Sequence, residues 1–335
     1  MELREIGEFG LIARIKKSIL PLFPGVLRGI GDDAAISSLT PGTELVSTVD
    51  LLVEGVHFNL SFTSAHILGR KSLAVNLSDI AAMGANPRFV LLSLALPAKT
   101  IVEFIDDFMR GFLEMARAHD VALIGGDTSS SPEGVFISVT LLGEGKKENL
   151  VCRCGAQPGD DLYVTGTLGD SLLGLQVAQK REGKPTSPEE AYLMERHLNP
   201  LPRLPEGKTL AERGLARAMI DVSDGLYSDL WHICEESQVG ATVWVERIPL
   251  SVPFQSLATV PKEQNWQLAV KGGEDYELLF AAASEKAWEL KELARHWKCG
   301  LTWIGKVEPF SQGVTIRNEQ GPVDDAFLKG YDHFA

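Results

Sequence analysis

The chain has 335 residues, of which 44% are hydrophobic and 23% are charged, and its formal net charge is −13 at pH 7. This length exceeds that of one usual hydrophobic core, so the sequence predicts two domains of similar size. The acidic balance argues against binding to nucleic acid or to an anionic membrane surface, because both need clustered Lys and Arg. No apolar run is long enough to cross a bilayer, no basic-then-apolar leader is present, and the four cysteines are too scattered for a disulfide framework. We therefore expect a cytoplasmic protein.

Hydrophobic periodicity predicts an α/β pattern in the first half of the chain. We expect strands at 44–52, 89–96, 121–124 and 135–142, and helices at 64–84 and 101–119. Between 144 and 160 the apolar pattern gives way to Gly, Lys, Glu and Pro, which predicts the domain junction there. The predicted domains are therefore residues 1–148 and 149–335.

A second α/β pattern follows the junction. We expect strands at 161–165, 218–220 and 268–270, helices at 170–180 and 226–236, and a proline-rich connector at 199–205. The strand at 218–220 delivers Asp-Val-Ser-Asp-Gly to the start of a helix, where unpaired backbone N–H groups can bind phosphate. The strand at 268–270 delivers Gly-Gly-Glu-Asp in the same way.

Carboxylates recur beside glycine or other small residues in segments that expose backbone. These segments are 31–34, 125–128, 221–225 and 272–275, with Asp50 and Asp79 between them. Carboxylate oxygens suit Mg²⁺, which shares its shell with substrate phosphates. Each acid alone could form a turn or cap a helix, as we expect of Asp32, but their number favours a shared site. An acidic chain can hold a polyphosphate only if several Mg²⁺ ions separate the negative groups, so the sequence predicts a Mg²⁺–nucleotide enzyme.

Familiar nucleotide and cation motifs do not account for these segments. The sequence contains neither a P-loop nor the His-Arg-Asp loop of protein kinases. Gly29-x-Gly31-x-x-Ala34 imitates a dinucleotide fingerprint, but it follows a proline-containing stretch and carries two acids that would oppose a bare pyrophosphate. Segment 221–225 lacks the alternating ligands and the closing glutamate of an EF-hand.

Six blocks of sequence, in order, cover essentially the whole chain. They are Gly-Ile-Gly-Asp-Asp-Ala at 29–34, Ala-Val-Asn-Leu-Ser-Asp-Ile-Ala-Ala-Met-Gly-Ala at 74–85, Ile-Gly-Gly-Asp-Thr at 124–128, Asp-Val-Ser-Asp-Gly-Leu at 221–226, Gly-Gly-Glu-Asp-Tyr-Glu-Leu at 272–278 and Gly-Tyr-Asp-His-Phe at 330–334. Together they resemble the thiamine-monophosphate kinase family, which belongs to the superfamily of aminoimidazole ribonucleotide synthetase and selenophosphate synthetase. The resemblance implies an α/β (α+β type) two-domain fold. It also implies a homodimer whose N-terminal mixed sheets form a barrel across the two-fold axis, with a C-terminal α/β domain completing the nucleotide and substrate site.

The resemblance also implies a role for each matching residue. The Mg²⁺ ions would be held by Asp33, Thr48, the Val49 carbonyl, Asp50, Asp79, Asp127, Asp221 and Asp224. ATP, the co-substrate, would contact Gly126, Asp127, Arg153 and Ser223. Thiamine monophosphate would contact His57, Glu274 and Tyr331. The catalytic residues would be Asp127, Asp224 and Arg153.

The residue types fit phosphoryl transfer. A phosphate monoester has a second pKa of about 6, so its oxygen is largely anionic at neutral pH and needs no general base. What the reaction needs is neutralisation of two polyanions held in line, by metal ions, backbone amides and Arg153. We therefore expect direct transfer of the ATP γ-phosphoryl group to thiamine monophosphate, which gives thiamine diphosphate and ADP. Arg153, between Cys152 and Cys154, could instead form a structural ion pair.

Two other functions remain open at this stage. The first is a sister ATP-dependent synthetase of the same superfamily; its selenium branch should carry a reactive cysteine near the N-terminus, and no cysteine precedes Cys152. The second is a non-catalytic acidic module that binds Ca²⁺ for stability. Such a module would bind Ca²⁺ more tightly than Mg²⁺ and would form no ADP.

Overall fold

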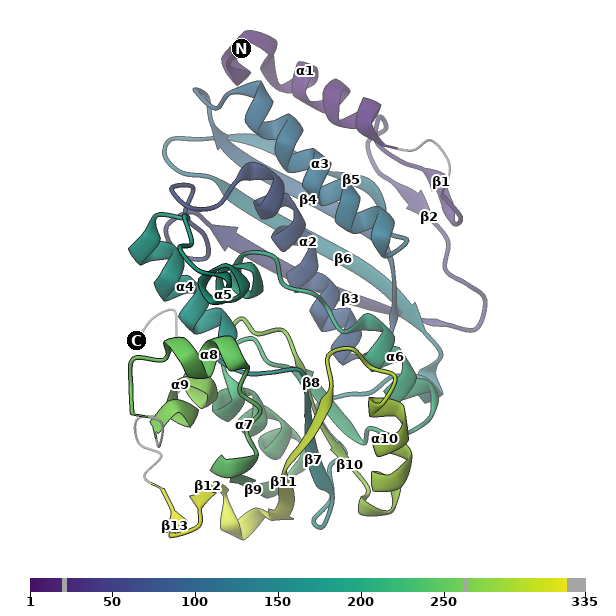
Figure 1. Ribbon diagram of the computed structural model, residues 1–335. Coiled ribbons are helices and arrows are strands. Elements are labelled where there is room, and N and C mark those ends of the chain that lie inside the picture. The colour runs from purple at the N-terminus through teal and green to yellow at the C-terminus, as the bar shows by residue number, and fades with distance from the viewer. Residues whose placement is uncertain (20–22, 262–263, 324–335) are drawn as a thin grey trace. The chain divides into compact units, whose positions relative to one another are not determined.

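A computed structural model describes all residues except 20–22, 262–263 and 324–335 (Figure 1). The chain divides into two compact units. The first comprises Met1–Ile80 and Ala85–Glu148, and the second comprises Ala81–Gly84 and the chain from Asn149 onward.

The first unit is built on a four-stranded mixed sheet. Its strand order is β3-β6-β4-β5, in which β4 and β5 run parallel and the other neighbours antiparallel. Helices α2 and α3 cross the same face of this sheet, and α1 lies beside α3 (Figure 1). The elements are α1 (Leu3–Ser18), β1 (Val26–Arg28), β2 (Ile36–Ser37), β3 (Glu44–Val53), α2 (Ala65–Ala82), β4 (Asn86–Pro97), α3 (Val102–Ala118), β5 (Ala122–Ser131), β6 (Phe136–Gly145) and the short 3₁₀ helix η1 (Lys147–Asn149).

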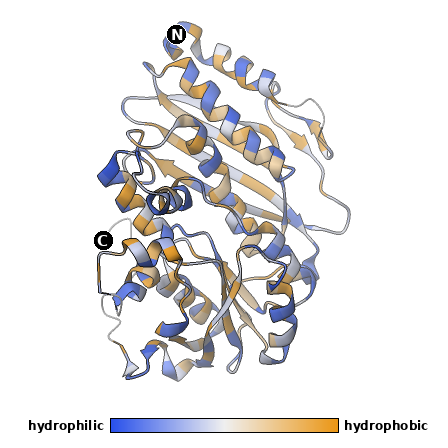
Figure 2. Ribbon diagram, in the orientation of Figure 1, coloured by the Kyte–Doolittle hydropathy of each residue, from blue (hydrophilic) through white to orange (hydrophobic). Residues whose placement is uncertain are grey.

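Apolar spacing explains how these elements pack. In α3, the side chains of Ile105, Phe108, Phe112 and Met115 repeat at helical spacing, and all four are buried. In β4, alternate residues from Val90 to Leu96 are buried on the helix-covered face, as a half-covered strand requires. Figure 2 shows the same pattern as hydrophobic strands beneath helices whose colouring is mixed.

The second unit contains a seven-stranded sheet of order β13-β12-β9-β11-β7-β10-β8. All neighbours are antiparallel except β12 and β9. The elements are β7 (Asp161–Thr165), α4 (Asp170–Arg181), α5 (Pro188–Leu198), α6 (Leu204–Glu212), β8 (Ala218–Asp221), α7 (Leu226–Ser237), β9 (Val239–Trp244), η2 (Val245–Arg247), α8 (Val252–Leu257), α9 (Asn265–Lys271), β10 (Leu278–Ala282), η4 (Ser284–Lys286), α10 (Ala287–Ala294), β11 (Leu301–Pro309), η5 (Phe310–Gln312), β12 (Val314–Asn318) and β13 (Gly321–Pro322).

Most elements predicted from the sequence are confirmed, and one is wrong. The expected strand at 268–270 lies in helix α9, so Gly-Gly-Glu-Asp follows a helix and not a strand. Trp266, Ala269 and Val270 are buried at helical spacing, whereas a three-residue apolar run cannot by itself distinguish the two structures. A smaller difference concerns β5, which continues through Gly-Gly-Asp-Thr where the sequence predicted that the strand would already have ended.

None of the helices in the described part of the chain combines the length and the hydropathy needed to cross a membrane.

Candidate functional site

Asp127 owes its position to an irregularity in β5. The pairing of β4 with β5 shifts between Val90↔Leu123 and Leu91↔Gly125, which marks a β-bulge just before the two glycines. Gly126 has φ +150°, and a Cβ atom at this position would lie 1.8 Å from the Leu92 carbonyl oxygen. Only glycine fits this close approach. The bulge leaves the following Asp127 side chain exposed, and one carboxylate oxygen accepts the Thr128 N–H at 2.9 Å.

Three of the predicted metal ligands meet between β3 and α2. Thr48 and Asp50 lie on the same side of β3, and the Thr48 hydroxyl donates a hydrogen bond to the Asp79 carboxylate. Burial first, and then the charge of Asp79, raise the pKa of Asp50 to about 7. Asp79 lies in the last turn of α2, where the helix dipole disfavours a negative charge. Helix stability therefore does not explain Asp79, whereas a cation placed between the two carboxylates would relieve their repulsion.

Val49 lies on the opposite side of β3 from Thr48 and Asp50, and its side chain is 62% exposed. A metal bond from this residue would have to come from its carbonyl group, as the sequence predicted. The strand β3 is an edge of the four-stranded sheet, so its outer side has no neighbouring strand within that sheet to occupy backbone carbonyls.

The adjacent acids Asp32 and Asp33 differ in their contacts. Asp32 accepts hydrogen bonds from the Arg28 side chain, at 2.7 Å from Nε, and from the backbone N–H of Asp33. Asp33 is exposed, and its carboxylate has no hydrogen bond or ion pair with any residue that the structure describes. The structural role expected for Asp32 thus has a visible partner in Arg28.

In the second unit, a carboxylate that the sequence analysis did not single out organises segment 221–225. One oxygen of Asp229, in the first turn of α7, accepts the N–H groups of Ser223, Asp224 and Gly225 at 3.0, 3.2 and 3.1 Å. These three N–H groups precede the first turn of α7 and are paired, so a phosphate contact of the kind predicted here would have to use N–H groups of the helix itself, which begins at Leu226. Burial, followed by the charges of Asp221 and Asp224, raises the pKa of Asp229 well above its ordinary value. The carboxylates of Asp221 and Asp224 thus lie near enough to Asp229 to act on its charge.

Backbone hydrogen bonds join segment 221–225 to segment 272–277. The N–H groups of Val222, Glu274 and Tyr276 donate to the carbonyls of Glu277, Ser223 and Val222, respectively, at 2.8 to 2.9 Å. Glu274 and Tyr276 both have positive φ, at 61° and 52°, which is uncommon for residues other than glycine. A Cβ atom on Gly273 would lie 2.4 Å from the Ser223 carbonyl oxygen, so this contact also requires glycine. Strained backbone of this kind is concentrated at functional sites.

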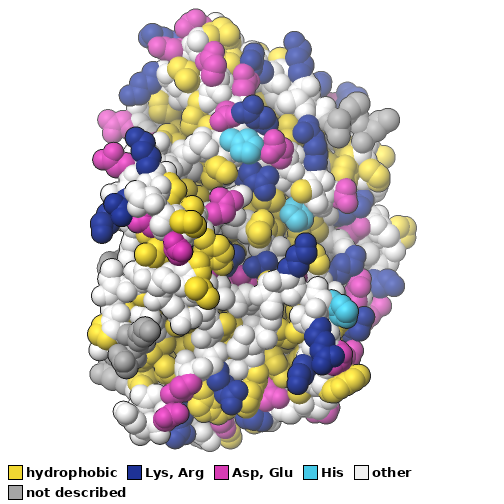
Figure 3. All heavy atoms as spheres, viewed as in Figure 1, with side chains coloured by type: hydrophobic (Ala, Val, Ile, Leu, Met, Phe, Trp, Pro, Cys, Tyr) yellow, Lys and Arg dark blue, Asp and Glu magenta, His cyan; other side chains and the backbone are white. Residues whose placement is uncertain are grey.

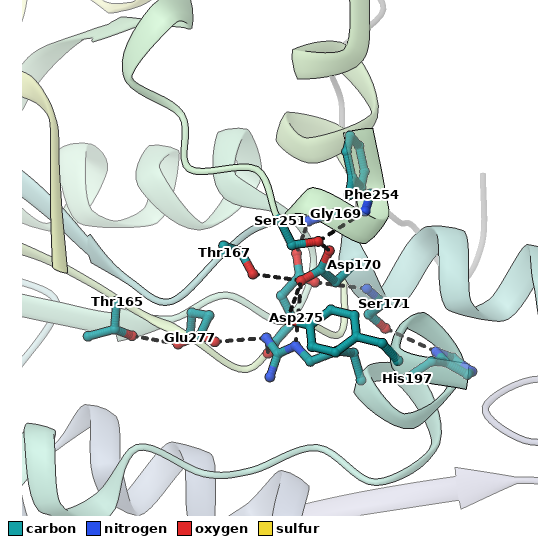
Figure 4. Close-up of polar contacts among 12 residues, drawn as sticks. Thr165, Thr167, Gly169, Asp170, Ser171, His197, Ser251, Phe254, Asp275 and Glu277 are labelled. Carbon is teal, nitrogen blue, oxygen red and sulfur yellow. Dashed lines mark hydrogen bonds and ion pairs between the residues drawn. The ribbon is translucent and has the colours of Figure 1, made fainter. Parts of the chain in front are cut away.

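Two acids of segment 272–277 hold the structure around α4 and α5 (Figure 4). Asp275 is buried and accepts the N–H groups of Gly169 and Ser171, at 2.6 and 3.0 Å, at the start of α4. Burial raises its pKa to about 7, against the opposing effects of Arg196 and these two hydrogen bonds. Glu277 is fully buried and pairs with two arginines, Arg196 at 2.7 Å and Arg203 at 2.5 Å, and also accepts from the Thr165 hydroxyl.

The predicted ligand-contacting residues have distinct surroundings. Arg153 is exposed, and its guanidinium forms no ion pair within the described chain; its carbonyl accepts the Ser237 hydroxyl at 3.1 Å. The Nδ1 atom of His57 accepts the Val53 N–H at 3.0 Å, which places the proton of the neutral ring on Nε2. Glu274 lies 3.3 Å from Nδ1 of His197 and is 29% exposed. Tyr331 lies outside the described residues.

No group of three His, Cys, Asp or Glu side chains among the described residues is close enough to hold a metal ion. The donor chemistry still fits Mg²⁺. This ion usually takes one or two carboxylates and completes its shell with water and substrate phosphates, so each ion needs few protein ligands. Burial first, and the neighbouring carboxylates second, raise the pKa values of Asp50 and Asp229, and a bound cation would oppose both effects. On the face seen in Figure 3, Lys and Arg are interspersed with Asp and Glu and form no continuous basic surface.

Residues 31–144 match the AIR synthase related protein N-terminal domain, and residues 157–316 match the corresponding C-terminal domain. The thiamine-monophosphate kinase of Escherichia coli strain K12 is 39% identical over 98% of this chain and 98% of its own length. These matches confirm the predicted α/β two-domain fold.

Solved structures give the same result. The crystal structure of thiamine-monophosphate kinase from Stenotrophomonas maltophilia K279a is 40% identical, with a TM-score of 0.83 over 93% of this chain and 96% of that chain. The structure of AaThiL complexed with AMPPCP and TMP is 33% identical, with a TM-score of 0.75 over 100% of this chain and 99% of that chain. With both domain matches and full-length relatives well above 30% identity, the chain belongs to the thiamine-monophosphate kinase family.

Proposed function

We propose that this protein transfers the γ-phosphoryl group of ATP to thiamine monophosphate and so forms thiamine diphosphate and ADP. The observation that carries the proposal is the full-length similarity to AaThiL, whose structure was solved with AMPPCP and TMP. AMPPCP is a non-hydrolysable analogue of ATP in which carbon replaces the oxygen that bridges the β- and γ-phosphorus atoms. The bond from this oxygen to the γ-phosphorus is the one that the reaction would break. Relatives named thiamine-monophosphate kinase at 35% to 39% identity support the same activity.

The protein's task in this reaction is electrostatic. The acceptor phosphate, with a second pKa of about 6, is already anionic at neutral pH, so no side chain has to remove a proton. Bound Mg²⁺ would supply the neutralising charge between the ATP triphosphate and the acceptor phosphate. The proposed ligands are two pairs of carboxylates, two exposed acids and two further donors on β3. They are Asp50 with Asp79, Asp221 with Asp224, the exposed Asp33 and Asp127, and Thr48 and Val49.

Other residues would position the two substrates. Gly126 is proposed to contact ATP through its exposed backbone. Arg153 offers an exposed guanidinium that suits bidentate binding of phosphate. Because Asp229 occupies the N–H groups of 223–225, Ser223 would contact ATP through its hydroxyl rather than through its amide. His57, Glu274 and Tyr331 are proposed for thiamine monophosphate, with the Glu274 carboxylate offsetting the thiazolium charge.

A homodimer and a cytoplasmic location are part of the same proposal. The β3 face opposite α2 exposes Leu45, Val49 and Leu51, which are 54%, 62% and 55% accessible. In a monomer, these three aliphatic side chains would stay exposed to water along one side of an edge strand, which favours association with other chains. Pairing across a two-fold axis would bury them. Sedimentation at micromolar concentration tests this, and a monomer there would contradict the barrel.

Two adjacent acids provide a matched test of the activity. Asp33→Asn and Asp127→Asn should fold yet lose turnover by 100-fold or more, of the order of 3 kcal/mol in transition-state stabilisation, whereas Asp32→Asn should keep it. The assay is coupled ADP release with thiamine monophosphate, thiamine and an aminoimidazole precursor as rival acceptors. Preference for the aminoimidazole precursor would indicate a sister synthetase. Absence of ADP together with tighter binding of Ca²⁺ than of Mg²⁺ would indicate the non-catalytic module.

A further inference from the structure

A cavity lies in the second unit, over strands β7 and β11. It measures about 510 Å³ and is lined by β7, β11 and α10. This volume is typical of small-molecule pockets. Small residues of α10, Ala287 and Ala294, leave the space open above the sheet.

Two cross-strand pairs form the floor of this cavity. Tyr163 of β7 lies directly opposite Trp303 of β11, and Asp161 lies opposite Lys306. The Tyr163 ring is stacked on Phe280 of the next strand, with centroids 5.5 Å apart, so its position is fixed. Lys306 and Asp161 form an ion pair at 3.3 Å. The floor thus offers a flat aromatic surface beside a partly neutralised charge.

The polar groups of the cavity favour an anion. Tyr163 is only 8% exposed, yet its hydroxyl makes no hydrogen bond with any residue that the structure describes. Burial, and then the charge of Asp161, raise the Tyr163 pKa to about 12, so this hydroxyl is a donor at neutral pH. Lys291, on the α10 wall, forms no ion pair within the described residues. Two lysines and one aspartate give the lining a net positive charge.

The order and register of the strands separate the Asp161–Lys306 end of this cavity from Asp221. Along β10, Leu278 pairs with Asp221 of β8, whereas Ala282 pairs with Asp161 of β7. The two positions lie four residues apart on one strand, or about 13 Å at 3.3 Å per residue. The cavity lies over β7 and β11, and β10 separates these two strands from β8, which delivers Asp221.

We propose that this cavity binds a planar aromatic anion, a carboxylate or a phosphate monoester carried on a flat ring. The ring would lie against Tyr163 and Trp303, while the anionic group would accept from the Tyr163 hydroxyl and pair with Lys291. A neutral aromatic ligand would cover the Tyr163 hydroxyl without offering it an acceptor, and a cation would face two lysines. The proposal does not depend on the kinase activity.

Isothermal titration calorimetry with the full-length protein tests the proposal. The probes are 2-naphthoate and 2-naphthyl phosphate, which distinguish the two kinds of anion. The matched controls are 2-naphthylmethylammonium, with the opposite charge, and cyclohexanecarboxylate, without an aromatic ring. At least one naphthyl anion should bind, and each control should bind at least tenfold more weakly than that anion.

Variants then locate the binding. Tyr163→Phe removes only the hydroxyl and Lys291→Gln only the charge, and each should weaken binding of the anion by about tenfold. Lys180→Gln, an exposed lysine on α4, should leave it unchanged, and all three variants should retain ATP-dependent turnover as a check of folding. Equal binding of the ammonium probe, equal binding by all variants, or no binding of either anion at millimolar concentration would each overturn the proposal.

Discussion

The carboxylate of Asp50 sets up a conflict between charge and stability. Burial and the neighbouring Asp79 raise its pKa from 3.8 to about 7. An acid whose pKa is higher in the folded chain than in the unfolded chain destabilises the fold as pH rises, because the unfolded chain loses the proton first. The penalty begins near pH 4, grows through the interval between the two pKa values and is complete above about pH 7.

Replacing this group by a neutral isostere should therefore stabilise the metal-free protein. At about 1.4 kcal/mol for each factor of ten in the protonation equilibrium, the shift sets an upper limit of roughly 4 kcal/mol. Partial solvation of the carboxylate brings the gain expected for Asp50→Asn at pH 8 to about 1–3 kcal/mol. The gain should shrink as pH falls toward 5, because the aspartate in the folded protein then becomes neutral as well.

Urea unfolding in EDTA from pH 5 to pH 8 measures this gain. The exposed Glu133→Gln variant, between β5 and β6, is the control and should show no trend with pH. With saturating Mg²⁺ and ATP, the parent protein should gain more stability than Asp50→Asn, since ligand binding favours the ionised site. A difference between parent and variant that stays constant across pH, or a variant less stable at pH 8, would refute the reasoning.

Three further substitutions test other parts of the site. Gly126→Ala should abolish turnover and lower the free energy of unfolding in urea by about 2 kcal/mol or more, because the new Cβ atom meets a backbone carbonyl. Gly29→Ala is the control and should have neither effect, because the nearest atom to its Cβ would be 3.8 Å away. Asp229→Ala should weaken ATP binding at least tenfold by calorimetry, since three N–H groups lose their acceptor; unchanged affinity would mean that segment 223–225 is ordered without it. Glu277→Gln should cost about 3–5 kcal/mol in thermal unfolding, because two largely buried arginines lose the carboxylate that they share. A cost below 1 kcal/mol would show that other groups, such as Asp170 beside Arg196, compensate.

Local signals in the sequence were sufficient for much of the fold. Apolar periodicity identifies α3 and β4, and the composition change near Glu148 coincides with the limit of the first unit. Periodicity fails at α9 because three apolar residues satisfy both a strand and one turn of helix. The β5 bulge is not visible either, because it depends on how β4 pairs with β5.

The supporting residues of the site escaped the sequence analysis for a related reason. Glu277 meets its two arginines across 81 and 74 residues of chain, and Asp275 meets Gly169 across 106. No local pattern encodes such pairs. Asp229 is different, because an acid four residues after a glycine that begins a helix could have been predicted to turn back to the preceding N–H groups. The prediction of a phosphate site at this segment did not take account of Asp229, which occupies the N–H groups of 223–225.

The backbone bonds between segments 221–225 and 272–277 also have a consequence for motion. Each segment supplies both donors and acceptors to the other, so neither can open while the other stays in place. Because Asp275 also holds the start of α4, opening would release that helix end as well. The amides of Val222, Glu274 and Tyr276 should therefore exchange with solvent as one cooperative unit and not one by one. Nucleotide that bound either segment would slow exchange in both.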